Sequence, residues 1–74
     1  MKLSELKKGE SGIVKKIGCK NPLKTRLNHL GLTEGVKIML VKKAPLNDPV
    51  EIKIRDFYLA IRVETAENIE IEKI

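Results

Sequence analysis

The side chains in this 74-residue chain that could ligate a metal ion are few and widely spaced. Cys19 and His29 lie ten residues apart, and neither Met1 nor Met39 adjoins them in the sequence. Transition-metal sites usually need clustered nitrogen, oxygen or sulfur ligands, so we expect no metal site. Cys19 is expected to be a small, half-buried side chain, although Lys20 beside it would raise its reactivity. His29 is expected on the surface near a helix C-terminus, where its cationic form is favoured.

The residues that could support catalysis also lack partners. Glu70 and Glu72 alternate along one segment, which is typical of a solvated edge strand. Ser4 and Ser11 have no base placed to activate them, and no phosphate-cradling glycine loop is present. Because no acid, base and nucleophile can be assembled, we predict that the chain is not an enzyme and uses no cofactor.

A single short helix is expected between Asn21 and Gly35. Asn21 is a good N-cap, and Pro22 suits the first helical position. The apolar stripe of this helix, with spacing i, i+4 and i+7, consists of Leu23, Leu27 and Leu30. Gly31 suits the left-handed position after the helix, Leu32 can fold back over the last turn, and Gly35 offers a second left-handed position.

In the rest of the chain, apolar and polar residues alternate in short runs, a pattern typical of β-strands. We expect strands at 10–18, 36–41, 50–55, 59–63 and 69–72, a loop at 44–49, and a short turn or 3₁₀ piece at 64–68. Leu3 and Leu6 are expected to plug one end of the core. Strands this few and short can bury both sheet edges by curling into a small barrel. The predicted fold is therefore mainly β: a small SH3-like five-stranded barrel with one inserted α-helix between the first and second strands, covering one open side. An OB-like barrel is the alternative, although it usually places its helix between the third and fourth strands.

Composition indicates a single domain spanning residues 1–74, reduced and cytoplasmic. One cysteine cannot form an internal disulfide, and no segment is apolar enough for a signal peptide or a membrane span. The net charge of +5 is unevenly distributed: residues 1–43 carry +8, and residues 44–74 carry −3. A basic half suggests an acidic partner surface, phosphate or an anionic membrane face, or alternatively a lysine-rich exterior that keeps the protein soluble.

The order of several short motifs resembles a known family. These motifs are L-x-x-L-x-x-G at 3–9, R-L-x-x-L-G-L-x-x-G at 26–35, A-P-L-x-D-P at 44–49, L-A-I-R at 59–62 and A-x-x-I at 66–69. Together they are similar to the FeoA family, the small ferrous iron transport protein A. Two positions differ, because Asn47 and Asp56 stand where the family often has glycine. Asn and Asp tolerate left-handed backbone, so we expect both turns to keep their geometry.

The resemblance implies an SH3-like barrel and a role beside a large membrane transporter of ferrous iron that carries a cytoplasmic GTP-binding domain. Related proteins are thought to act there as adaptors or modulators. The same domain also forms the C-terminal part of iron-dependent repressors, but no helix-turn-helix segment precedes it here. We therefore expect an adaptor that binds the transporter's cytoplasmic GTP-binding part and is neither inserted in the membrane nor bound to nucleic acid.

The expected partner-binding residues are Arg26, Leu30, Leu32 and Leu46, near the helix end and the adjoining loops. Arg26 either reaches a partner's nucleotide or packs its stem along the helix with its guanidinium in water. The alternative function is single-stranded nucleic-acid binding by a basic barrel, using the lysines at 15, 16, 20, 24, 42 and 43. A stacking platform is missing from that alternative, because Phe57 and Tyr58 are adjacent and point to opposite faces.

Overall fold

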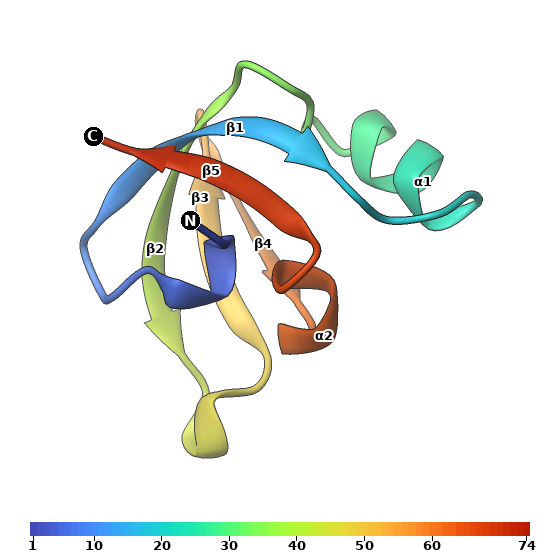
Figure 1. Cartoon of the computed structure of the whole chain (residues 1–74). Coiled ribbons are helices and arrows are strands. Elements are labelled where there is room, and N and C mark those ends of the chain that lie inside the picture. Colours follow the sequence, from blue (N-terminus) through green and yellow to red (C-terminus); the bar gives the residue numbers. More distant parts are fainter.

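The computed structural model describes all residues, 1–74, as five strands joined by short helical segments. The elements are η1 (Leu3–Glu5), β1 (Ser11–Ile17), α1 (Leu23–His29), β2 (Lys37–Lys43), η2 (Pro45–Asn47), β3 (Val50–Ile54), β4 (Phe57–Ile61), α2 (Val63–Ala66) and β5 (Ile69–Lys73). The strands form one antiparallel sheet in the order β4-β3-β2-β1-β5 (Figure 1). The prediction of a mainly β fold with five strands is confirmed.

The sheet curls because two of its ladders contain register shifts. One shift lies between Val14 and Lys16 in the β1–β5 ladder, and the other between Leu40 and Lys42 in the β2–β3 ladder. Such irregularities increase the local twist and bend a strand, which lets a short sheet wrap around its own side chains. The two outer strands, β4 and β5, share no ladder, so hydrogen bonds do not close the barrel.

Alternate residues of the strands turn inward and form one apolar core without a buried polar side chain. Its fifteen members are Leu3, Leu6, Val14, Ile17, Leu27, Leu32, Ile38, Leu40, Val50, Ile52, Ile54, Ile61, Ala66, Ile69 and Ile71. The clean alternation in β3 buries Val50, Ile52 and Ile54 completely. Leu3 and Leu6 are equally buried, as expected for leucines that plug one end of the core.

The helix α1 is shorter and more peripheral than the sequence suggested. It begins at Leu23, and Pro22 occupies the N-cap position without a side-chain hydrogen bond to the backbone. Leu27 alone of the leucine stripe is buried, whereas Leu30 keeps 41% of its surface exposed. Figure 1 shows α1 to one side, beyond the end of β1, so it does not form a lid across an open side of the sheet.

The glycines after α1 behave as predicted. Gly31 has φ of +100°, and the Leu32 N–H donates to the Leu27 carbonyl at 3.0 Å, which folds the chain back over the last turn. Gly35 has φ of +91° and lets the chain turn into β2.

Three other segments correct the sequence-based expectations. In the β3–β4 hairpin the left-handed residue is Arg55, with φ of 54°, and not Asp56. In the loop after β2, Asn47 is left-handed as expected, with φ of 63°, but Leu46 is left-handed as well, with φ of 68°. The segment predicted as a turn after β4 contains α2, which starts at Val63, a residue assigned to the strand by its alternation.

Candidate protein-interaction site

The structure brings no metal-ligating cluster together. No group of three or more His, Cys, Asp or Glu side chains is placed to hold an ion. His29 is exposed at the end of α1. Cys19 is half-buried, its Sγ lies 4.0 Å from the Thr65 carbonyl oxygen, and burial raises the pKa of its thiol. A raised pKa keeps the thiol protonated, which makes Cys19 a weaker nucleophile than its neighbour Lys20 suggested.

Leu46 is the most exposed large apolar side chain of the molecule. It keeps 97% of its surface in contact with water and sits in a left-handed backbone conformation at the tip of the loop that follows β2. Both features are unfavourable for a leucine, because its Cβ crowds the backbone there and its side chain gains nothing from burial. Left-handed residues other than glycine cluster at binding sites, where the surrounding structure holds them in place.

The loop that carries Leu46 is firmly held at its base. The Ala44 N–H donates to the Pro49 carbonyl at 2.9 Å, and the Asn47 N–H donates to the Ala44 carbonyl at 2.7 Å. Asp48 accepts from the Val63 N–H at 3.1 Å. The loop therefore presents its leucine on a fixed support, and little conformational entropy is lost when a partner covers it.

The four residues expected to contact a partner do not form one patch. Leu32 has no exposed surface, so its side chain belongs to the core and is not available to a partner in this conformation. Arg26 on α1 and Leu30, the residue that caps the C-terminus of this helix, are exposed. Leu46 follows the far end of β2, whose seven residues separate it from the α1 end by about 20 Å at about 3.3 Å per residue.

The exposed apolar surface near α1 has a second contributor that the sequence did not indicate. Phe57 is 38% exposed, and its ring lies where a Cβ on Gly31 would come within 3.2 Å of it. The hairpin end of β4 therefore meets the end of α1 close to Leu30, which provides a second small apolar area. Only the three-dimensional fold brings these residues together, because more than twenty positions separate them in the sequence.

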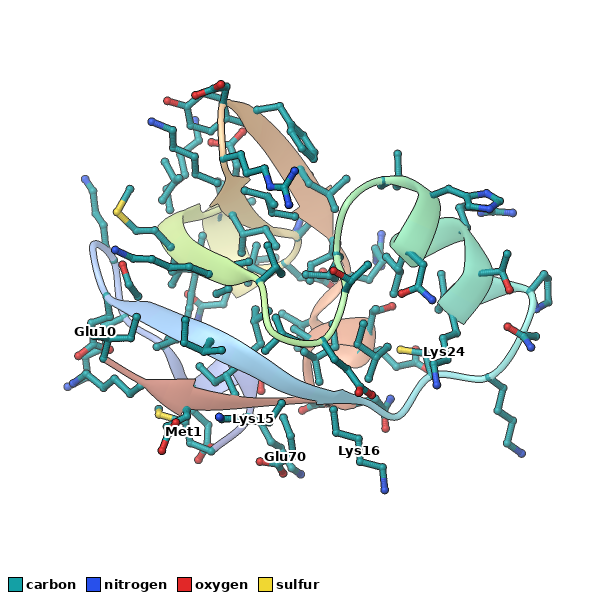
Figure 2. All side chains as sticks on the ribbon, turned by 90° about the horizontal axis from the view of Figure 1, so that it is seen from above. Met1, Glu10, Lys15, Lys16, Lys24 and Glu70 are labelled. Carbon is teal, nitrogen blue, oxygen red and sulfur yellow. The ribbon has the colours of Figure 1, made fainter.

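Ion pairs are concentrated along β1 and β5. The Met1 amino group pairs with Glu70 at 3.2 Å, Lys15 pairs with Glu72 at 3.1 Å, and Lys73 pairs with Glu10. Figure 2 shows Met1, Glu10, Lys15 and Glu70 along the β1–β5 side, away from the β3–β4 hairpin. The Lys73 amine and the Lys7 N–H hold the pKa of the Glu10 carboxyl below its usual value. Acids and bases therefore neutralise one another on this side.

A cationic groove lies over β2, on the outward face of the sheet. It encloses about 520 Å³ and is lined by Ser11, Gly35, Val36, Lys37, Ile38, Met39, Lys53 and Arg55. None of the six lysines considered for nucleic-acid binding lines it, and one of them, Lys15, is paired with Glu72. No pattern in the sequence indicated this groove, because its cations come from β2 and from the β3–β4 hairpin, which only the strand register brings together.

No helix in the structure is both long enough and apolar enough to cross a lipid bilayer.

Comparison with known proteins finds relatives that match the chain over its full length. Residues 1–73 match the FeoA domain. The chain is 35% identical over its full length to an Fe(2+) transport protein A/Fe(2+) transporter FeoB fusion protein of Porphyromonas gingivalis, of which it spans only 9%.

Two solved structures support the same assignment. The solution structure of the FeoA protein from Chlorobium tepidum matches with a TM-score of 0.96 and 36% identity, covering all of this chain and 70% of the other. The zinc-complexed FeoA of Stenotrophomonas maltophilia, described as a prokaryotic SH3 domain protein, matches with a TM-score of 0.79 and 25% identity, covering 97% of this chain and 89% of the other. These likenesses confirm the predicted SH3-like fold. With its sequence matched almost end to end, the chain belongs to the FeoA family, which is associated with ferrous iron transport.

Proposed function

We propose that this protein is a small cytoplasmic adaptor that binds the cytoplasmic GTP-binding part of a ferrous iron transporter and modulates it. The observation that carries the proposal is the Porphyromonas gingivalis relative, in which a related segment and the transporter are one polypeptide. Covalent linkage gives two segments a high effective concentration, so a contact of modest affinity becomes populated. A separate chain of the same family would make the same contact between molecules.

In this proposal the whole chain, residues 1–74, acts as a single FeoA-like domain without catalytic activity. Modulation then has to come from binding. A protein that binds one conformation of its partner more tightly than another shifts the partner toward that conformation by the difference in binding free energy. Neither a covalent step nor a bound cofactor is required of the adaptor.

The Leu46 loop is the main contact surface in this proposal, and Arg26 and Leu30 form a second one. A fully exposed leucine on a rigid loop suits insertion into an apolar pocket, which is how a few side chains supply most of the energy of many interfaces. Arg26 provides a planar cation for a carboxylate or phosphate on the partner. Because the two surfaces lie at opposite ends of β2, a partner has to extend along the sheet to touch both.

The test is retention of the transporter's purified cytoplasmic domain on this immobilised protein, with GTP, with GDP and without nucleotide. We expect saturable retention at tens of micromolar that differs between nucleotide states, because an adaptor that modulates must discriminate conformations. Leu46→Ala should reduce retention, and Ile74→Ala, at the exposed C-terminus, is the matched apolar control. Absence of retention in every nucleotide state would contradict the proposal.

A further inference from the structure

We infer that the groove over β2 binds an acidic extended segment of a protein partner, with carboxylates at alternate positions. The inference deepens the proposed function and rests on it for the identity of the partner. The occupant follows from three features of the groove: the signs of its charges, their spacing and the apolar surface between them.

The groove carries three cations and no carboxylate. Lys37, Lys53 and Arg55 line it, and none of the three makes an ion pair within the molecule. The Lys53 amine lies 5.8 Å from the centre of the Tyr58 ring, a contact that orients the amine without neutralising it. On the β1–β5 side of the same sheet, three bases each face an acid. The lining of the groove therefore has a net positive charge that favours an anionic occupant.

The strand register places these cations side by side. Met39 pairs with Ser11 on one side and with Lys53 on the other, so these three side chains form a row across the outward face. Ile38 pairs with Ile54, which puts Lys37 beside Arg55 just beyond the end of that ladder. Two like charges next to each other on adjacent strands repel, and an anion between them would remove that repulsion.

The spacing of the cations matches an extended peptide. Lys53 and Arg55 are two residues apart, which corresponds to about 7 Å along an extended chain. Carboxylates on alternate residues of an extended segment repeat at the same interval. A compact phosphate would instead need several donors converging on one point, such as a row of backbone N–H groups at a glycine-rich turn.

The floor of the groove is apolar. Met39 lines it with an outward-facing side chain and the partly buried Val36 adjoins it, whereas the Ile38 side chain is buried in the core. A Cβ on Gly35 would meet no atom within 4 Å, so the groove is open at that end. Methionine adapts its shape to different neighbours and is frequent at surfaces that receive peptides. An apolar side chain on the segment, flanked by its carboxylates, would pack against this floor.

The experiment uses the full chain and a fluorescein-labelled octapeptide in which glutamate alternates with leucine. The matched peptide carries glutamine in place of every glutamate. We expect saturable binding of the glutamate peptide, weakening as salt rises, and at least tenfold weaker binding of the glutamine peptide. In ¹⁵N-labelled protein, the amide shifts should concentrate at Gly35, Lys37, Met39, Lys53 and Arg55. Absence of saturable binding at millimolar peptide, or equal binding of the two peptides, would overturn the inference.

Two variants of equal net charge separate the groove from overall charge. Lys37→Glu with Lys53→Glu reverses the charge of two groove residues. Lys8→Glu with Lys20→Glu reverses the charge of two exposed lysines outside the groove. The groove variant should bind the glutamate peptide at least tenfold more weakly than wild type, and the control variant within twofold of it. Equal losses in the two variants would overturn the inference. If the groove variant does not fold, the wild-type protein alone provides the test. Amide shifts on adding the glutamate peptide that spread over lysines far from the groove would then overturn the inference.

Further ligands distinguish the occupant and the partner. GTP, inorganic phosphate or phosphatidylserine vesicles that occupy the groove more tightly than the peptide would overturn the assignment to an acidic segment. If the transporter's cytoplasmic domain binds the wild type and the groove variant equally, the inference is wrong and the adaptor role stands. If that domain does not bind but the peptide does, the adaptor role is wrong and the groove remains a site for an acidic segment.

Discussion

Replacing Leu46 by asparagine should make the free protein more stable and its complex weaker. In the left-handed region the Cβ of leucine crowds the backbone, whereas asparagine tolerates this region far better. We expect relief of about 0.5–1 kcal/mol, which for a domain of this size raises Tm by about 2–8 °C. Burial is not lost in the free protein, because the side chain is 97% exposed.

The effect on binding should have the opposite sign. Covering a leucine that was fully exposed contributes about 1.5–3 kcal/mol, so its loss weakens the complex by about tenfold to hundredfold. Thermal unfolding followed by circular dichroism measures the first effect, and calorimetric titration with the transporter's cytoplasmic domain measures the second.

A matched variant separates the two causes. Leu46→Ala removes the apolar contact but keeps a residue that is poorly suited to left-handed backbone, so it should weaken binding with little change in Tm. A fall of several degrees in Tm for Leu46→Asn would show that the leucine supports the fold, and unchanged affinity would show that it is not an anchor. Either result would contradict the role of Leu46 as an exposed contact residue that the fold does not need.

Three further predictions concern the fold. Leu32→Ala should lower the free energy of unfolding by about 2–5 kcal/mol in urea denaturation, because the side chain has no exposed surface; a loss below 1 kcal/mol would contradict its place in the core. Asp56→Gly should lower Tm and Arg55→Gly should not, because the positive φ lies at Arg55, and the reverse order would contradict this turn. Glu10→Gln should destabilise the protein at neutral pH, and the difference from wild type should close as pH falls through the folded pKa of Glu10. Because Lys73 lowers that pKa below its unfolded value, the stabilisation is present above about pH 4.5. Urea denaturation at several pH values tests this, and a difference that persists at low pH would argue against the ion pair.

The strands were predictable where one face of the sheet is buried and the other is exposed to solvent. In β3 and β5 the buried isoleucines alternate with charged residues, so period two was visible in the sequence. The glycine-ended α1 was also visible, because Gly31 and Gly35 do take positive φ. Periodicity shows that side chains share a face but not what that face meets, and for this reason the leucine stripe of α1 was expected to cover the core although only Leu27 is buried.

The turns and the groove were harder to predict for physical reasons. A two-residue hairpin turn can place positive φ at either central residue, and in this chain it falls on Arg55, the residue with the less suitable side chain. The groove joins Lys37 from the basic half of the sequence to Lys53 and Arg55 from the acidic half. Charge counted along the chain therefore concealed a cluster that the register of β2 and β3 creates.

Amide chemical-shift mapping of the ¹⁵N-labelled protein during titration with the transporter's unlabelled cytoplasmic domain tests the adaptor role most directly. We expect saturable changes confined to the Leu46 loop, the exposed end of α1 and the groove over β2, with little change along the ion-paired β1–β5 side. Absence of any change at several hundred micromolar domain, or changes centred on β1 and β5, would contradict this expectation.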